Sequence, residues 1–326
     1  MNTHQARCAP LPPSSRERRP RVLVLLATHN GARFVSVQLK SILDQQGADV
    51  TVVASDDSST DGTQELLRAV ADSDSRVQLL SPGHFGSAAD NFLRLLRDSP
   101  VDEADFIGLA DQDDIWESDK LVRALDALWS GCADGYSSNL LAFDDLSGTE
   151  WIIDKSSPPK ALDYLFGGAS AGCTYLLSRR AARVVRDAIH TQPLRGWSHD
   201  WLFYAICRSH QFPWVFDKTA RIRYRQHAAN AYGAQSGIQG AVWRARQISS
   251  GWYCNQVLSN GRYLRQSSDE LSVLRRMAVL GARERLWLAA NSFHFRRDAS
   301  GVIGLAAFMP IMGRGSDSLR AEYLGC

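Results

Sequence analysis

The segment Val22-Leu-Val-Leu-Leu-Ala27 is a continuous apolar run that stops at the polar residues Thr28-His-Asn-Gly31. An apolar run without polar alternation is typical of a parallel strand that helices cover on both faces. A helical stretch at about residues 33–44 follows, and then a second apolar strand, Val50-Thr-Val-Val-Ala-Ser55, which also ends in polar residues. These three pieces predict a βαβ unit.

The alternation continues along the chain. After residue 61 the sequence predicts a helix, a short strand at about 76–80, a helix at about 88–97 and the strand Asp105-Phe-Ile-Gly-Leu-Ala110. This order indicates an α/β fold with an open, mostly parallel sheet and helices on both faces. Ligands of such sheets bind beyond the carboxyl ends of the strands. We therefore expect the polar clusters that follow the strands at residues 22, 50 and 105 to converge on one site.

The pattern weakens after about residue 129. Helices are predicted at about residues 179–189, 198–208 and 271–290, and only helices are expected from residue 234 onward. We therefore divide the chain into a disordered leader (1–20), an α/β body (21–233) and a helical extension (234–326).

Composition limits the function classes. The net charge of the 326 residues is +2, which gives no case for a nucleic-acid partner. The extension, however, holds twelve Arg and no Lys against six acidic residues, so it favours either a solvated helix surface or peripheral contact with anionic lipid. The six cysteines lack zinc-like spacing, the N-terminus up to Pro20 lacks the apolar stretch of a signal sequence, and no apolar run is long enough for a membrane span. A cytoplasmic protein, with peripheral contact at the inner face of the cytoplasmic membrane, is the expectation.

The acidic run Asp111-Gln112-Asp113-Asp114 directly follows the strand at 105–110. Three carboxylates within four residues repel one another unless a cation neutralises them, and their hard oxygen atoms suit Mg²⁺ or Mn²⁺. The alternative is a solvated turn in which Asp114 or Ser118 caps the next helix.

A second polar cluster, running from Asp56 to Thr63, follows the strand at 50–55. It is not an EF-hand, because Arg68 stands where a bidentate Glu is required. Either Asp56 or Asp57 is a candidate for contact with the base or ribose of a nucleotide, and the polar residues Thr60, Asp61 and Thr63 are candidates for capping the next helix.

A third cluster offers Thr28 and Asn30 as partners for a base and Arg33 as a partner for a phosphate. Gly83-His-Phe-Gly86, leading into a helix with Asn91, is a further candidate for lining the nucleotide site. Neither GxGxxG after the first strand nor GxxxxGK[ST] anywhere occurs, which argues against a dinucleotide-binding fold and a P-loop NTPase.

These clusters together resemble family 2 glycosyltransferases, and more narrowly their bacterial rhamnosyltransferase-like branch. The resemblance rests on Ala27-Thr-His-Asn-Gly31, on Asp56-Asp-Ser-Ser-Thr-Asp-Gly-Thr63 and on Ala110-Asp-Gln-Asp-Asp-Ile-Trp116, which stand in the family's order and at its separations. It implies a GT-A fold, an inverting reaction and a metal-bound sugar nucleotide, with residues 21–116 as the donor half and 117–233 as the acceptor half.

The resemblance also implies roles for single residues. Asp56 or Asp57 would meet the nucleoside, and Asp111 and Asp113 would form the DxD element. Asp113 is then the direct metal ligand, supported by Asp111, which also faces the donor. Asp114 is left as a helix cap.

Two further matches lie in the second half. Trp197-Ser-His-Asp200-Trp201 is similar to the family's acidic motif, so Asp200 is the candidate general base that takes the proton of the acceptor hydroxyl, and a helix cap is its alternative or additional role. Tyr224-Arg225-Gln-His227-Ala-Ala-Asn230 resembles the branch's YRQHxxN signature. It implies His227 as a third ligand of a Mn²⁺-type ion and Arg225 as a partner of the leaving diphosphate.

One departure concerns the acceptor side. The family's Asn-x-Gly cluster is replaced here by the stretch from Gly167 to Cys173, which contains no Asn.

The expected reaction is an inverting transfer of a sugar to a bacterial surface polysaccharide or a lipid-linked glycan precursor. The resemblance implies rhamnose from dTDP-rhamnose as the donor. A haloacid-dehalogenase-type phosphatase is the first alternative, since Asp111 and Asp113 follow an apolar strand, but that class has its motif after the first strand. A non-catalytic sugar-nucleotide-binding protein is the second alternative, although Asp111, Asp113, Asp200 and His227 are all present.

Overall fold

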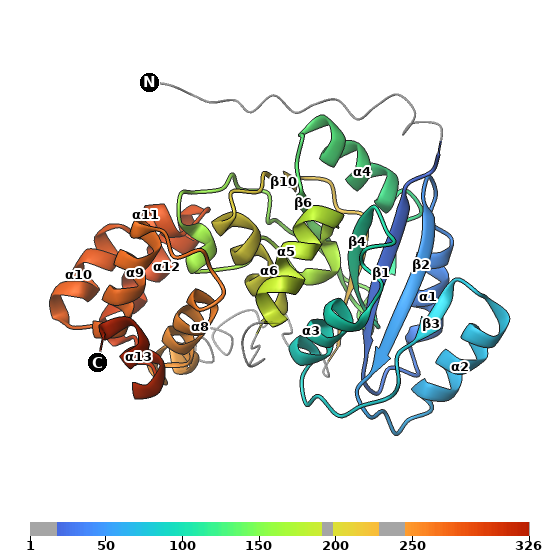
Figure 1. Ribbon diagram of the computed structural model, residues 1–326, viewed down its shortest axis with the longest axis horizontal. Helices are drawn as coiled ribbons and strands as arrows, with labels where there is room; N and C mark the ends of the chain where they lie inside the picture. Colours follow the sequence, from blue (N-terminus) through green and yellow to red (C-terminus); the bar gives the residue numbers. More distant parts are fainter. Residues whose placement is uncertain (1–17, 191–197, 228–244, 326) are drawn as a thin grey trace.

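The computed structural model describes residues 18–190, 198–227 and 245–325. Most of the predicted leader, and the predicted boundary between residues 233 and 234, lie outside these ranges. Figure 1 shows an α/β body at one end of the molecule and the C-terminal helices at the other.

The body is built around strand β1 (Arg21–Thr28), which pairs in parallel with β2 (Asp49–Asp56) on one side and β4 (Phe106–Asp111) on the other. The complete sheet has seven strands in the order β10-β6-β9-β4-β1-β2-β3. Its remaining members are β3 (Val77–Leu79), β6 (Gly135–Ser138), β9 (Leu176–Ser178) and β10 (Trp214–Asp217). Only β9 runs antiparallel to its neighbours, β4 and β6, so the predicted mostly parallel sheet is confirmed.

Helices cover both faces of this sheet, because the side chains of β1 point alternately to two cores. Leu23 and Leu25 pack in the core formed with helices α3, α5 and α6, whereas Val22 and Val24 pack in the core formed with α1, α2 and α4. These helices are α1 (Val35–Leu43), α2 (Thr63–Ser73), α3 (Ala88–Asp98), α4 (Lys120–Ser130), α5 (Arg179–His190) and α6 (His199–Ser209). The elements predicted between residues 22 and 110 are all present.

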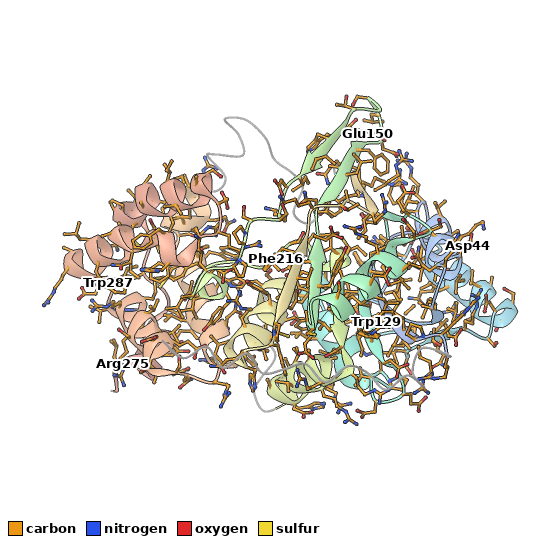
Figure 2. All side chains as sticks on the ribbon, turned by 90° about the horizontal axis from the view of Figure 1, so that it is seen from above. Asp44, Trp129, Glu150, Phe216, Arg275 and Trp287 are labelled. Atoms are coloured by element: carbon orange, nitrogen blue, oxygen red, sulfur yellow. The ribbon has the colours of Figure 1, made fainter. Side chains whose placement is uncertain are left out.

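A second, four-stranded sheet has the order β5-β11-β7-β8 and was not predicted. Its strands are β5 (Ile115–Trp116), β7 (Leu140–Asp144), β8 (Glu150–Ile153) and β11 (Ile222–Gln226). Strands β7 and β8 form a hairpin that projects from the body, with Glu150 near its tip (Figure 2). Strand β11 pairs with β5, which starts directly after the acidic run, and thereby brings residues 222–226 beside that run.

The described part of the extension consists of helices, as predicted. They are α8 (Trp252–Gly261), α9 (Ser268–Val279), α10 (Ala282–Ala290), α11 (Ser292–Phe295), α12 (Ala299–Phe308) and α13 (Asp317–Leu324), with the 3₁₀ turn η4 (Met309–Ile311). Two more 3₁₀ turns, η2 (Asp163–Leu165) and η3 (Gly172–Thr174), lie in the body. Tyr253 on α8 donates a hydrogen bond to the Phe166 carbonyl and joins the extension to the body. Within the described ranges, none of the helices has the length and apolar character to cross a bilayer.

The single helix predicted at residues 271–290 is wrong. Leu280 adopts a left-handed conformation with φ of 43° and ends α9, and Gly281 then begins α10 as its N-cap. Left-handed backbone is a common way to end a helix, although Gly or Asn usually provides it, so a leucine there gave no signal in the sequence.

Candidate active site

The ends of β1 and β4 are joined by the side chain of Gln112. Its amide accepts a hydrogen bond from His29 N at 2.8 Å and donates one to His29 O at 2.9 Å. A Cβ atom at Gly31 would lie 2.2 Å from Gln112 Oε1, so any side chain at this position would displace Gln112 from these hydrogen bonds. The predicted convergence of the strand ends is therefore present, and Gln112 is a positioning residue that the sequence did not single out.

Asn30 joins the end of β1 to the loop after β2. It adopts a left-handed conformation with φ of 49°, which Asn tolerates better than most residues. Its backbone N–H donates to Ser59 Oγ at 2.7 Å, and its side-chain oxygen accepts from Thr60 N at 2.9 Å. Thr28, the other predicted base contact, is buried and donates to Asp56 at 2.9 Å.

The Asp56 carboxylate is satisfied by its own chain. It accepts hydrogen bonds from Thr28 Oγ1, Ser59 N, Ser59 Oγ and Gln64 Nε2, all between 2.6 and 2.9 Å. Four donors fill the acceptor capacity of a carboxylate, and only 4% of Asp56 is exposed. Asp56 therefore organises the loop.

Asp57 has a different environment. It accepts hydrogen bonds from Phe85 N at 2.6 Å and Gly86 N at 3.0 Å, which leaves part of its acceptor capacity unused. The predicted Gly83–Gly86 segment thus meets the strand end through Asp57. Asn91 lies deeper, 1% exposed, and donates to Ser55 O at 2.9 Å, so it is a buried link between elements and not part of the site surface.

A polar side chain accepts a hydrogen bond at the start of α2, as predicted, but it belongs to the residue before the N-cap position. Gly62 is the N-cap residue, and the Asp61 carboxylate accepts from Thr63 N at 3.1 Å and Thr63 Oγ1 at 2.5 Å.

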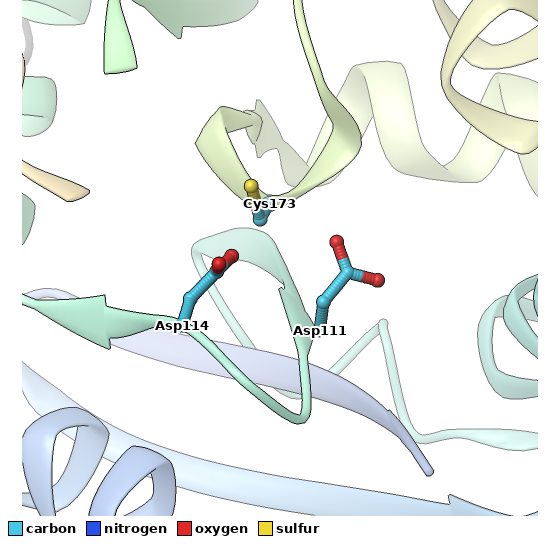
Figure 3. A group of neighbouring side chains, drawn as sticks. All are labelled: Asp111, Asp114 and Cys173. Carbon is cyan, nitrogen blue, oxygen red and sulfur yellow. The ribbon is translucent and has the colours of Figure 1, made fainter. Parts of the chain in front are cut away.

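The acidic turn after β4 is shown in Figure 3, where Asp111 and Asp114 both point toward Cys173 of η3. One ligand atom from each of these three residues lies within 4.8 Å of the others. The prediction of Asp114 as a helix cap is wrong, because α4 begins at Lys120 and its N-cap is Asp119. Asp114 is instead 1% exposed and lies beside Cys173, and its Oδ1 atom accepts a hydrogen bond from Arg225 N at 3.4 Å.

Burial and mutual repulsion act on these carboxylates. Burial, together with the charges of Asp113 and Asp200, raises the pKa of Asp111 to about 7. Burial and the charges of Asp111 and Asp113 raise the pKa of Asp114 well above its usual range. Burial and the charges of Asp114 and Asp111 also raise the pKa of the Cys173 thiol, which is thus a poor metal ligand. The turn favours a cation held by hard oxygen atoms.

His227 lies next to Asp113, as the sequence motif implied. Its Nε2 atom is 2.9 Å from Asp113 Oδ2, and its ring stacks on Phe34 with centroids 5.0 Å apart. Adjacent ligand atoms around an octahedral ion at about 2.1 Å are about 3 Å apart. The separation of this carboxylate and imidazole is compatible with two ligands of one Mg²⁺- or Mn²⁺-type ion. Asp111 lies two residues away on the same turn, but its carboxylate groups within 4.8 Å with Asp114 and Cys173, and that group does not include Asp113 or His227.

Arg33 and Arg225 meet at a residue that the sequence did not indicate. Arg33 pairs with Asp145 Oδ2 at 2.7 Å, and Arg225 pairs with Asp145 Oδ1. Arg225 also donates to the Asp113 carbonyl at 3.0 Å. Asp145 lies in the loop between β7 and β8. No local sequence feature predicts it, because its partners are 112 and 80 residues away.

Asp200 lies in the first turn of α6, whose N-cap is Ser198. Its Oδ1 atom accepts hydrogen bonds from Trp201 N at 2.7 Å and from the Ser198 hydroxyl. A Cβ atom at Gly172 would be 3.4 Å from the Asp200 Cβ, and Gly172 precedes Cys173. The altered stretch from Gly167 to Cys173 therefore brings α6 close to the acidic turn.

A cavity of about 840 Å³ lies elsewhere, between the body and the C-terminal helices. Its lining includes Tyr164, Trp214, Glu270 and Trp287, and none of the predicted site residues belongs to it.

The sequence matches a known family over this site. Residues 23–180 fit the family model described as glycosyl transferase family 2. The dTDP-rhamnosyl transferase RfbG of Shigella flexneri is 34% identical over 237 residues, which cover 71% of this chain and 82% of that protein. The chain belongs to glycosyl transferase family 2. This glycosyltransferase thus acts on a nucleotide-sugar donor, and the phosphatase alternative is not favoured.

Solved structures confirm the fold. TarS 1-349 of S. aureus, crystallised with UDP-GlcNAc, aligns with a TM-score of 0.54 at 13% identity over 89% of this chain and 80% of that chain. The mannosyltransferase PcManGT of Pyrobaculum calidifontis, in complex with GDP-Man and Mn²⁺, aligns with a TM-score of 0.50 at 16% identity over 94% of this chain and 79% of that chain. The family 2 enzyme has the predicted GT-A fold.

Proposed function

We propose that this glycosyltransferase transfers rhamnose from dTDP-rhamnose, with inversion, to a bacterial surface polysaccharide or a lipid-linked glycan precursor. The observation that carries the proposal is the 34% identity to a dTDP-rhamnosyl transferase over 82% of its length. In this proposal residues 21–116 bind the donor, residues 117–233 face the acceptor, and the extension from 234 is a separate helical part.

The metal site of the proposal consists of Asp113 and His227, supported by Asp111. The distance of 2.9 Å between His227 Nε2 and Asp113 Oδ2 and the raised pKa of Asp111 support this metal site. The Mn²⁺ in the PcManGT structure supports it as well. Mn²⁺ or Mg²⁺ bound there would neutralise charge on the diphosphate as it departs.

Donor contacts come from three strand ends. Asp57, which has unused acceptor capacity, is proposed to contact the base, while Asp56 and Asn30 hold the loop and Thr28 supports Asp56. Arg33 and Arg225 are proposed to bind the phosphates, because guanidinium groups pair with phosphate oxygens in a bidentate manner.

Asp200 is proposed as the general base. Its Oδ1 atom is oriented by Trp201 N and Ser198, and among the described residues Oδ2 has no hydrogen-bond partner. That oxygen is thus available to take the proton of the acceptor hydroxyl as the oxygen attacks the anomeric carbon.

A donor panel tests the proposal. Purified enzyme is incubated with dTDP-rhamnose and with UDP- and GDP-sugars, with Mn²⁺ or with EDTA, and release of the nucleoside diphosphate is measured. We expect turnover of dTDP-rhamnose that needs Mn²⁺ and falls at least about 100-fold in Asp113→Ala. Asp119→Ala, in the same segment but paired with Arg221 at 3.0 Å, is the matched control. Turnover that ignores both the metal and Asp113 contradicts the mechanism.

Asp200→Asn separates the base from the binding site. Transfer to an acceptor is expected to fall by about 10²- to 10⁴-fold, with the KM for the donor nearly unchanged. A normal transfer rate in Asp200→Asn would remove Asp200 from the reaction.

We further propose that the enzyme works in the cytoplasm and touches the membrane through its extension. The four cysteines described in the structure are free thiols, which suits a reducing compartment. Leu286 on α10, Ile303 on α12 and Ile311 on η4 are 74%, 69% and 54% exposed, and these three elements pack together. With the Arg-rich composition of the extension, they suit the interface of an anionic bilayer.

Vesicle sedimentation tests this contact. The enzyme is expected to bind vesicles of mixed phosphatidylglycerol and phosphatidylcholine, and to bind phosphatidylcholine alone much less. Leu286→Asp with Ile303→Asp should abolish binding, whereas Leu146→Asp, which changes a leucine 94% exposed on the β7–β8 loop, should not. The membrane contact is contradicted if the unchanged enzyme and both variants bind the vesicles equally, or if the unchanged enzyme does not bind them.

A further inference from the structure

Phe34 contacts three of the residues to which the proposed function assigns metal and phosphate binding. Its ring stacks on the His227 imidazole, with centroids 5.0 Å apart and an interplanar angle of 21°. The guanidinium carbons of Arg225 and Arg33 lie 4.8 Å and 5.0 Å from the centroid of the same ring. One half-buried phenyl ring thus meets both the candidate metal ligand and the candidate phosphate partners.

The backbone that carries this ring is fixed from two directions. Phe34 is the N-cap residue of α1, and its N–H donates to the Gly31 carbonyl at 2.9 Å, which ties it to the end of β1. Its carbonyl accepts from Gln38 N at 3.2 Å, and the buried Gln38 side chain donates to the Asp111 carbonyl at 2.9 Å. The ring therefore projects from a helix start that is tied to the acidic turn.

A second ring shares only part of these contacts. Phe143 on β7 is buried, and the guanidinium carbons of Arg225 and Arg223 lie 4.7 Å and 4.9 Å from its ring centroid. Stacking on an aromatic face orients a guanidinium group and leaves its N–H groups at the edge to pair with anions. In the described part of the chain, Phe143 stacks on no histidine. It therefore distinguishes support of Arg225 from support of His227.

We propose that Phe34 is a positioning residue that holds the His227 imidazole and the Arg225 guanidinium in the relative position needed to bind the metal ion and the donor diphosphate together. This inference rests on the metal and donor sites of the proposed function. Groups that orient a metal-ligating histidine affect metal affinity, and an oriented guanidinium loses less freedom when it binds a phosphate. Loss of the ring should therefore weaken binding of both, although Phe34 supplies no ligand atom to either.

The experiment measures, by calorimetric titration of the full chain, binding of Mn²⁺ alone and then of dTDP to the Mn²⁺-saturated protein. Phe34→Leu keeps an apolar side chain and removes the ring, whereas Phe34→Tyr keeps the ring. We expect Phe34→Leu to bind each ligand about three- to tenfold more weakly, and Phe34→Tyr to bind both as the unchanged protein does. Phe143→Leu should weaken the binding of dTDP and leave that of Mn²⁺ unchanged.

Phe212→Leu is the matched control. Phe212 is also half-buried, stacks on His210 with centroids 6.2 Å apart and lies 5.0 Å from the guanidinium carbon of Arg180, but these residues lie outside the candidate site. This variant should bind both ligands as the unchanged protein does. A double-mutant cycle gives a further readout: Phe34→Leu should weaken Mn²⁺ binding little further once His227→Ala is present, because the ring acts on the metal through that imidazole.

The outcomes are distinct. If the unchanged protein fails to bind Mn²⁺ or dTDP, the proposed metal or donor site fails, and this inference fails with it. If the unchanged protein binds both ligands but Phe34→Leu also binds either of them as tightly, or does not fold, the ring has only a packing role and the inference alone is overturned. Weak binding by Phe34→Tyr, or an undiminished effect of Phe34→Leu on Mn²⁺ affinity in the His227→Ala background, also overturns it.

Discussion

The loop at Asp56 and Asp57 and the turn from Asp111 to Asp114 look alike in the sequence, since both place several carboxylates at the end of a buried strand. In the structure, donors of the chain itself surround the first pair, four at Asp56 and two at Asp57. The carboxylates of the second group face one another and a thiol, and the pKa values of Asp111 and Asp114 are raised. The first pair is thus held by hydrogen bonds within its own loop, whereas the second group keeps two buried carboxylates that repel each other and could be neutralised by a cation.

The largest effect is expected from the first cluster. Asp56→Ala would leave the buried Thr28 hydroxyl and the half-buried donors of Ser59 and Gln64 without an acceptor, and we expect a loss of about 3 to 5 kcal/mol in the free energy of unfolding. Asp57→Ala should cost much less stability and act on donor affinity instead. Urea unfolding and calorimetric titration with dTDP separate the two. If Asp56→Ala and Asp57→Ala lowered stability and dTDP affinity by the same amounts, the two aspartates would not have different roles.

The two histidines beside these clusters offer a second test, by pH. His199 stacks on Phe92 at 4.0 Å, and burial lowers its pKa from 6.5 to about 4, whereas His84 beside Asp57 has an 83% exposed side chain. The pKa of His199 is lower in the folded protein than in the unfolded chain, so protonation favours unfolding. The free energy of unfolding should therefore be unaffected by His199 above pH 6.5 and should fall as the pH drops toward 4, by at most about 3 kcal/mol. His199→Gln should flatten the dependence of unfolding free energy on pH in this window. His84→Gln changes an exposed histidine and is the matched control, and an unchanged slope in His199→Gln would contradict the prediction.

The smallest effect is expected at Asp111, and its sign is opposite to that at Asp56. The raised folded pKa means that ionisation of Asp111 destabilises the metal-free fold as the pH rises from 3.8 through about 7. At pH 8 in EDTA, Asp111→Asn should therefore stabilise the protein by about 1 kcal/mol while reducing turnover. Denaturation of both proteins at pH 8, with and without Mn²⁺, measures this gain. If Asp111→Asn were less stable than the unchanged protein in EDTA, the Asp111 carboxylate would be stabilising, like that of Asp56, and the prediction would be wrong.

The sequence predicted those parts of the fold that depend on short-range pattern. Strands β1, β2 and β4 are apolar along their length because both faces are buried, and their polar ends meet where a parallel sheet requires. The second sheet escaped prediction, because β5 has two residues and β8 is largely exposed, so neither has a hydrophobic period.

In the candidate site, too, contacts between residues far apart in the sequence could not be predicted from local pattern. Asp113 and His227 were predicted as neighbours only through a family motif, because nothing local joins residues 114 positions apart. Asp114 was taken for a cap since Asp commonly precedes helices, but tertiary burial against Cys173 decides its position. Asp145 carried no signal, since a surface-loop aspartate is ordinary in sequence.

The bridge from Asp145 to Arg33 and Arg225 has a consequence for how a ligand arrives. One carboxylate already occupies the two guanidinium groups that are proposed to receive a diphosphate. Any phosphate that engages them competes with an internal anion in the loop at the tip of the β7–β8 hairpin. Donor binding at this point is an exchange of anions, and release of Asp145 would free the hairpin loop at the moment the donor is bound.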